Sequence, residues 1–167
     1  MNALIFNGTV IQIEATTFPV HSSLTWEPIP AGQTVEVGYT FANGTFTAPP
    51  APPTPTLAQQ AAAALGAGLT VTSTGTPAIN GTYAIADGVA FGRADIGTEA
   101  QFISTFSEFT NGTQTLEWPL LNGTFVTFPS TASFMNFAKA AAQYYAAVKA
   151  VVAAGQGSFP SNQVTIP

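Results

Sequence analysis

The sequence predicts an α+β protein in which a small antiparallel β-module, a proline-rich linker and a C-terminal domain follow one another. In that domain β-hairpins are expected to pack on a long C-terminal helix. Three observations predict this: five copies of Asn-Gly-Thr, five prolines within nine residues, and a long stretch rich in Ala and aromatic residues near the end. We divide the chain into residues 1–47, 48–56 and 57–167.

The Asn-Gly-Thr tripeptides predict tight hairpins. Asn and Gly tolerate the positive φ that both central residues of a type I′ turn require, and that turn matches the twist of paired strands. Strand-forming residues flank most copies, which begin at Asn7, Asn43, Asn80, Asn111 and Asn122. In the first module, Thr34–Phe41 alternates apolar and polar residues, so we predict a strand with Val35, Val37, Tyr39 and Phe41 on one face.

Five prolines lie within residues 48–56, between the first module and the C-terminal domain. Residues 48–56 lack most amide donors and favour polyproline II, which predicts a stiff spacer. An Ala-rich helix is expected over Leu57–Gly66, with Gly66 and Gly68 ending it, and strands over 69–73 and 79–85. After a Gly-rich loop, the pair Thr98 and Gln101 has capping-box spacing, so a helix is expected from about Glu99 to Glu108.

The last third contains the clearest hairpin and the longest helix. Strands over 114–121 and 124–128 flank Asn122-Gly123. Ser130 or Thr131 can cap a helix that runs to about Ala154, with Gly155 after it. The helix carries two adjacent apolar stripes, which predict burial on two sides: Phe134, Phe137, Ala141, Tyr144, Val148 and Val151 in one, and Met135, Ala138, Ala142, Tyr145 and Val152 in the other. The tail over 158–167 is expected to add a strand to a sheet edge.

Composition favours protein partners over other kinds. Only 7% of residues are charged, against roughly a quarter in typical soluble domains. Interface cores are depleted of charge and enriched in aromatics, so an assembled protein is expected, with a low-charge secreted β-protein as the alternative. Three basic residues cannot neutralise a row of phosphates, so no nucleic-acid binding is expected. No membrane span or signal peptide is expected from the apolar pattern.

No residue pattern predicts chemistry. Cysteine is absent, and a lone histidine, His21, has no carboxylate at ligand spacing, so no metal or cofactor is expected. His21 is interpreted as a hydrogen-bonded turn residue. Asp87, Asp95 and Glu99 lie near Arg93, the only arginine, and paired carboxylates are what a glycosidase needs. The Gly-rich surroundings favour a solvated loop instead, so no enzyme is predicted.

The segment Leu69–Tyr83, which ends in Asn-Gly-Thr-Tyr, resembles the C-terminal domain of an uncharacterised family encoded in tail-fibre regions of tailed phages and prophages. The resemblance extends over residues 57–167 and includes the Trp118-Pro119 hairpin, the phrase Phe128–Phe134 and the ending Val164–Pro167. The first module, with Phe18-Pro-Val-His and Leu-Thr-Trp26, resembles the small tail-protein module that precedes it. One departure is a longer Gly-rich insertion over 86–97.

The resemblance implies a structural component of a tailed-phage virion, made in the host cytoplasm, that acts as a docking or adaptor protein at the tail tip, baseplate or fibre base. A tail-fibre assembly chaperone and a capsid decoration or head-fibre protein are the alternatives. Expected partners are other phage structural proteins and copies of the chain, in a homo-oligomer with a trimer among the options. Interface candidates, each of which also fits a core position, are Trp26, Tyr39, Trp118, Phe125, Phe134, Tyr144 and Tyr145.

Overall fold

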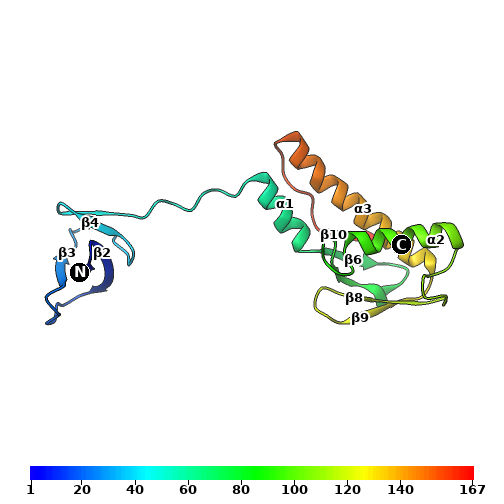
Figure 1. The fold of residues 1–167 in the computed structure, drawn as a ribbon, viewed down its shortest axis with the longest axis horizontal. Helices are drawn as coiled ribbons and strands as arrows, with labels where there is room; N and C mark the ends of the chain where they lie inside the picture. The colour runs from blue at the N-terminus through cyan, green and yellow to red at the C-terminus, as the bar shows by residue number, and fades with distance from the viewer. The chain divides into compact units, whose positions relative to one another are not determined.

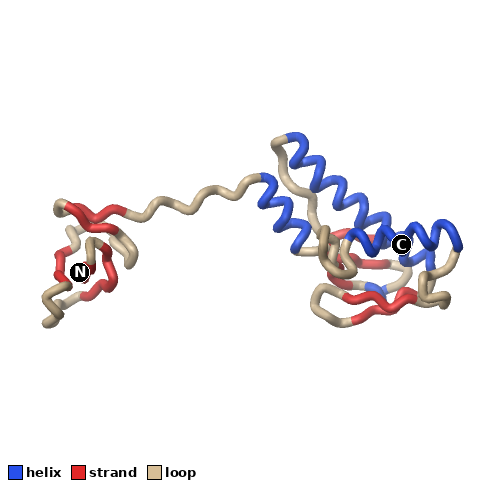
Figure 2. The backbone as a smooth tube through the Cα atoms, viewed as in Figure 1, coloured by secondary structure: helices blue, strands red, loops and turns tan.

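The protein has a mixed α+β structure, described for residues 1–167 by a computed structural model. The chain forms two compact units, Met1–Thr54 and Pro55–Pro167, and the division falls inside the proline-rich segment. Residues 48–56 are exposed and form no helix or strand, as Figures 1 and 2 show for the thin connection between the units. Because proline has no backbone N–H, this segment lacks most of the hydrogen-bond donors that pairing with a strand would require.

The first unit is one antiparallel sheet with the strand order β3-β1-β2-β4-β5. Its strands are β1 (Asn2–Phe6), β2 (Thr9–Glu14), β3 (Leu24–Pro28), β4 (Thr40–Ala42) and β5 (Thr45–Thr47). A small core on one face consists of Ala3, Ile5, Val10, Val35 and Phe46. With so few buried side chains, the unit has little apolar area to stabilise it.

Two of the five Asn-Gly pairs form the predicted turns. Asn7 has φ 48° and Gly8 has φ 75°, and the pair at Asn43 has φ 51° and 75°, so both central residues are left-handed in each turn. The prediction of a type I′ turn is wrong at the other three pairs, where Asn is not left-handed, although the predicted hairpin around Asn122-Gly123 is present as the antiparallel pair of strands over 116–119 and 125–128. Asn122 instead accepts a hydrogen bond on Oδ1 from the amide of Thr124 at 3.0 Å, a local turn that competes with type I′.

The predicted strand over Thr34–Phe41 is also wrong. Only its last two residues belong to a strand, and Val37 is 63% exposed instead of sharing a buried face with Val35. The amide of Tyr39 donates to the carbonyl of Glu36, and Gly38 has φ 94°, so the chain turns between them. The apolar alternation is present, but a glycine in the left-handed region ends it.

The second unit contains three helices and two small sheets. The helices are α1 (Leu57–Gly66), α2 (Arg93–Phe106) and α3 (Thr131–Ala154), with a 3₁₀ turn, η1, at Pro77–Ile79. One sheet has the order β10-β6-β7, and the other is the hairpin β8-β9. The strands are β6 (Leu69–Ser73), β7 (Gly81–Tyr83), β8 (Leu116–Pro119), β9 (Phe125–Phe128) and β10 (Gln163–Ile166). Helix α1 packs against α3, and Figure 1 shows α3 above the strands.

Several elements begin and end where local signals place them. Thr56 caps α1 in a capping box with Gln59, although the sequence analysis did not identify this cap. Ser130 caps α3, and Gly155 ends it with φ 70°, both as predicted. The tail forms β10, which pairs in parallel with β6 of its own sheet.

Helix α2 begins six positions before its predicted start. The helix starts at Arg93 after Gly92, and Thr98 lies inside it, where its hydroxyl donates to the carbonyl of Ala94 at 2.9 Å instead of capping an end. Within a helix, a Thr hydroxyl can donate its hydrogen bond to the backbone carbonyl four residues earlier. The Gly-rich loop is therefore shorter than predicted, and the helix begins beside the residues described below as the candidate site.

Aromatic side chains fill the core of the second unit. Phe134 is fully buried and contacts four other rings edge-on or nearly so, those of Phe109, Trp118, Phe128 and Phe137. Phe137 stacks obliquely on Tyr83, at a centroid distance of 4.3 Å. These contacts join α3 to β7, β8 and β9 and to the segment after α2, so the first predicted stripe of α3 is the core-facing one.

The connection from α1 to β6 depends on a glycine. Gly68 has φ 76°, and a Cβ there would lie 2.6 Å from the carbonyl oxygen of Tyr83. We expect Gly68→Ala to lower the free energy of unfolding by about 2 kcal/mol or more, because strain and a backbone clash add. Gly66→Ala is the matched control, since Gly66 is helical with open space around it, and it should be neutral or stabilising by up to about 1 kcal/mol. Urea denaturation measures both, and equal effects would contradict the assignment.

Candidate functional site

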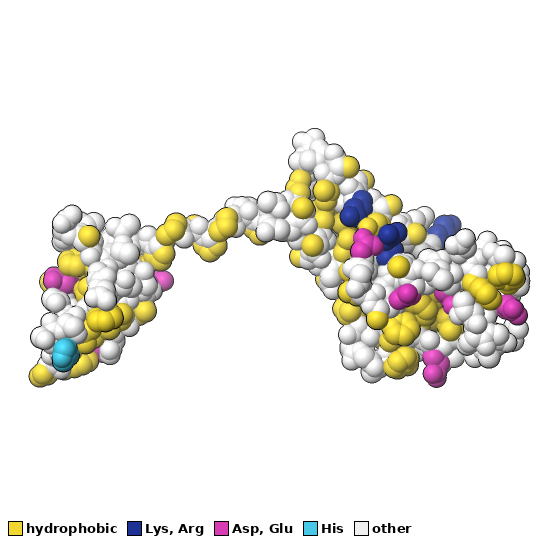
Figure 3. Space-filling model, viewed as in Figure 1, with side chains coloured by type: hydrophobic (Ala, Val, Ile, Leu, Met, Phe, Trp, Pro, Cys, Tyr) yellow, Lys and Arg dark blue, Asp and Glu magenta, His cyan; other side chains and the backbone are white.

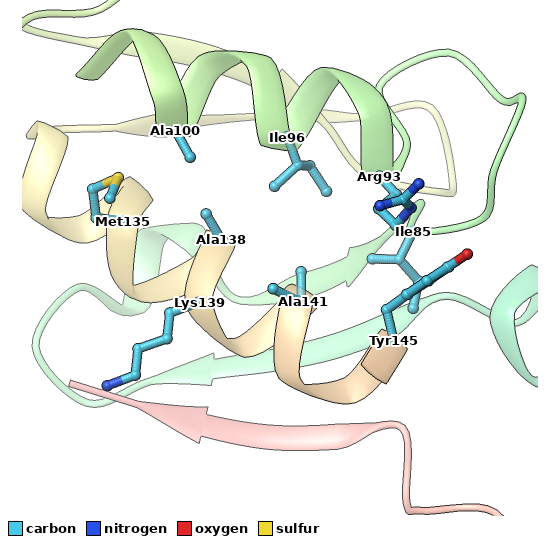
Figure 4. Close-up of a pocket in the computed structure, with 11 residues that line it drawn as sticks. Ile85, Arg93, Ile96, Ala100, Met135, Ala138, Lys139, Ala141 and Tyr145 are labelled. Carbon is cyan, nitrogen blue, oxygen red and sulfur yellow. The ribbon is translucent and has the colours of Figure 1, made fainter. Parts of the chain in front are cut away.

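An apolar hollow of the second unit lies between α2 and α3. It is a cavity of about 360 Å³ that opens to solvent, and Figure 4 shows Ile96 and Ala100 of α2 facing Ala138 and Ala141 of α3 across it. Several of the side chains that line it are small, so they leave the space between the two helices unfilled. The complete lining is Ile85, Arg93, Ile96, Gly97, Ala100, Met135, Ala138, Lys139, Ala141, Ala142 and Tyr145.

The second predicted stripe of α3 forms one wall of this cavity. Met135, Ala138, Ala142 and Tyr145 all line it, and only Ala138 of the four is fully buried. A second cavity, of about 290 Å³, lies farther along the same helix against α1, and Val152, the last member of the stripe, lines it with Lys149. The predicted burial of this stripe is confirmed in part: Ala138 is buried, Met135, Tyr145 and Val152 pack against the core, and Ala142 is exposed. Beside these contacts α3 also borders two hollows that are open to solvent.

A polar cluster stands between the two cavities. Asp87 accepts a hydrogen bond from Nε of Arg93 at 2.6 Å through Oδ1 and one from the hydroxyl of Tyr145 through Oδ2. The guanidinium of Arg93 lies 4.5 Å from the ring centroid of Tyr145, and Nζ of Lys149 lies 5.4 Å from the same centroid. The Tyr145 ring thus makes cation–π contacts with both Arg93 and Lys149. The contact with Arg93 joins α3 to the start of α2.

Protonation of Asp87 is coupled to this geometry. Its hydrogen bonds with Tyr145 and Arg93 lower the pKa of the carboxyl group below its ordinary value. The same bond with Asp87 raises the pKa of Arg93. Asp87 and Arg93 are each about half exposed, so water screens the pair, and the cluster positions side chains more than it stabilises the fold.

All three basic residues of the chain lie on this side of the second unit. Arg93 and Lys139 line the first cavity and Lys149 lines the second. Figure 3 shows the basic side chains gathered along the helices, with an acidic group among them. Arg93 is paired with Asp87, whereas neither lysine has a carboxylate within 4.0 Å. The chain is acidic as a whole, with a formal charge of −5. Its lysine and arginine side chains are therefore concentrated on this one side of the second unit.

The three carboxylates considered for catalysis have separate structural partners. Asp87 belongs to the cluster above, and Asp95 accepts from the amide of Phe91 at 2.6 Å. Glu99 is buried and accepts from both the amide and the hydroxyl of Thr110, at 2.9 and 2.6 Å. Glu99 therefore holds the segment that follows α2. The structure does not present these carboxylates as a facing pair.

His21 lies in an exposed turn of the first unit. Nδ1 of His21 lies 2.9 Å from the hydroxyl of Ser23 in an exposed turn, in agreement with the interpretation from sequence. No group of three or more His, Cys, Asp or Glu side chains is placed to hold a metal ion. No helix combines the length and apolarity needed to cross a bilayer.

The aromatic interface candidates fall into three groups. Trp118, Phe134 and Tyr144 are buried in the second unit and serve its core, whereas Phe125 on β9 is 63% exposed. Trp26, Tyr39 and Tyr145 are half-buried. Tyr145 belongs to the cluster between the cavities. The structure therefore separates core from surface among residues whose type alone does not distinguish them.

The first unit has an apolar second face that the sequence analysis did not identify in full. Trp26 pairs with Leu4 and Leu24 pairs with Phe6 across β1 and β3, which places these four side chains on the face opposite the small core. Phe18 packs edge-on against Trp26 at 5.1 Å, and the indole N–H donates to the carbonyl of Phe18. Phe6 and Phe18 are 43% and 46% exposed. The continuous apolar run Ala3–Phe6 was the available signal.

We expect Phe134→Leu to destabilise the protein by roughly 2 kcal/mol, because it removes edge-to-face contacts in a fully packed site. Phe125→Leu is the matched control on an exposed ring and should change stability by less than about 0.5 kcal/mol. Chemical denaturation monitored by circular dichroism distinguishes the two. A large effect at Phe125 would contradict the separation of core and surface aromatics.

The carboxylate bridge predicts a pH-dependent effect. Because the pKa of Asp87 is lowered in the folded state, the bridge contributes stability above the ordinary carboxyl pKa of about 3.9, and this contribution is lost as the pH falls through the lowered value. Asp87→Asn should therefore lower the melting temperature at pH 7, and the difference from wild type should shrink as the pH falls through the lowered pKa of Asp87. Glu117→Gln, at an exposed carboxylate without a hydrogen bond, is the control. A difference that persists unchanged at low pH would contradict the bridge.

Comparison of the chain with protein-family models, curated proteins and solved structures found no match.

Proposed function

We propose that the chain is a structural adaptor of a tailed-phage particle, located at the tail tip, baseplate or fibre base. In this proposal the antiparallel β-module of residues 1–47 docks to one component, residues 48–56 act as the spacer, and residues 57–167 bind copies of the chain or fibre proteins. The phage assignment derives from the resemblance of Leu69–Tyr83 and the segments around it. The adaptor role derives from the geometry of the two units.

One observation carries the adaptor role: each unit closes its own core and still exposes an apolar surface. Unit Met1–Thr54 exposes Phe6 and Phe18 beside Trp26, and unit Pro55–Pro167 exposes the cavities along α3. Grouped exposed apolar side chains are typical of surfaces that bind other proteins. Two such surfaces on separately cored units favour a chain that joins two partners.

The low charge of the chain supports the same proposal. With 7% charged residues and exposed aromatic rings, the surface has the composition of an interface more than that of a free monomer. The β-module contains three glutamates and no lysine or arginine, so ion pairs contribute little to its docking. Apolar contact is then the main source of binding free energy for that unit.

We expect the protein at a fixed ratio to the major tail proteins when purified particles of the encoding phage are quantified by mass spectrometry. A tail-fibre chaperone would be missing or far below stoichiometric amounts in the same particles. Immunogold labelling at the head would support the decoration or head-fibre alternative. Absence from particles, together with a monodisperse single chain in solution, would reject the proposal.

The apolar face of the β-module predicts a specific docking defect. Replacing both Phe6 and Phe18 with Ser should lower incorporation into particles about tenfold or more, because each buried anchor contributes roughly 1 kcal/mol or more to binding. Val37→Ser is the control, since Val37 is 63% exposed but lies outside this face. Equal incorporation of both variants, with folding verified by circular dichroism, would show that the face does not dock.

A further inference from the structure

The side of α3 that bears Met135, Ala138, Ala142, Tyr145 and Val152 is only partly covered by α1 and α2, and Ala142 on it is exposed. This surface, which we term the α3 face, borders the cavity against α2 and the cavity against α1. Both hollows are apolar and open to solvent. The cluster of Asp87, Arg93 and Tyr145 separates them.

The spacing of the two cavities favours an elongated occupant. Their linings on α3 centre near positions 140 and 150, which places them roughly 15 Å apart along the helix at about 1.5 Å per residue. One compact molecule would fill a single cavity and leave the other open. A polypeptide segment can place one apolar side chain in each, with its backbone crossing the polar cluster between them.

Charge defines the chemistry of that segment. Arg93, Lys139 and Lys149 border the α3 face, and they are all the lysine and arginine of a chain that contains eight acidic residues. Lys139 and Lys149 lack a carboxylate partner within 4.0 Å. Asp87 also lines the second cavity, but it is paired with Arg93, so the unpaired charges beside the hollows are the two lysines. Such a rim favours an acidic segment over a basic one.

We propose that the α3 face binds an acidic segment of another protein, which places two apolar side chains in the two cavities and carboxylates beside Lys139 and Lys149. If the segment is extended, the two anchors lie about four or five residues apart, and if it is helical, about ten. The inference rests on the proposed adaptor function and names the chemistry of the partner that the second unit joins.

Selection of a displayed library of random peptides on the full-length chain tests the proposal. We expect selected peptides to share two apolar residues and at least two Asp or Glu, and to bind more weakly as salt rises. Ala142→Trp covers the first cavity from an exposed position and should weaken a selected peptide about tenfold or more. Ala147→Trp, on an exposed part of α3 that lines neither cavity, is the matched control.

Charge reversal separates the ionic contribution. Lys139→Glu should weaken the same peptide severalfold, and Gln143→Glu, an added carboxylate away from both cavities, should not. Selected peptides without acidic residues, or binding that Ala142→Trp leaves unchanged, would overturn the proposal. If no peptide is selected and Ala142→Trp instead abolishes self-association of the chain, the occupant is a second copy and the proposal is also overturned.

The outcomes for the site and for the adaptor function are distinguishable. Peptide binding is measured on the isolated chain, whereas the adaptor function is measured by its presence in particles. A chain that binds the predicted peptides but is missing from particles retains the α3 site and loses the phage role. A chain present in particles to the same extent with and without Ala142→Trp retains the structural role, and the partner is then not held by the α3 face.

Discussion

The packing of Phe134 and Phe137 against the surrounding rings holds the second unit together. These two residues, one turn apart on α3, contact aromatic side chains from β7, β8 and β9 and from the segment after α2. Edge-to-face and oblique contacts restrict ring orientation more than aliphatic packing does. They therefore fix which side of α3 faces the core. The buried carboxylate of Glu99 fixes Thr110 and thereby brings Phe109 to the cluster.

That orientation determines which part of α3 remains outside the core. With its aromatic stripe buried, the neighbouring stripe borders the hollow between α3 and α2 and the hollow between α3 and α1. Gly97, Ala100, Ala138 and Ala142 are too small to fill the hollow between α2 and α3. The bridge from Asp87 to Arg93 and Tyr145 then fixes where α2 begins relative to α3. The α3 face is therefore a consequence of the core and of this one polar contact.

Charge is scarce in this protein, and several of its charged groups have structural partners. Asp87, Arg93 and Glu99 each bond to a specific group, while Lys139 and Lys149 remain without a carboxylate beside the cavities. The β-module has no lysine or arginine and exposes aromatic rings instead. The two units thus present surfaces of different chemistry, one apolar with acidic residues nearby and one apolar with a basic rim. An adaptor that must distinguish two partners needs such a difference.

Local signals in the sequence determined α1, α3, β6, the two type I′ turns and the capped ends of the long helix, because caps, turns and periodicity act over a few residues. Only the tertiary structure decided the start of α2, since Gly92 offers no side-chain cap and Asp87 bonds to Tyr145, which is 58 residues away. The tertiary structure also decided that Thr34–Phe41 is not a continuous strand, because the chain turns at Gly38. The second stripe of α3 predicted a second covered face. How much of it α1 and α2 cover depends on how closely each of them packs on α3, which is decided by residues distant in sequence.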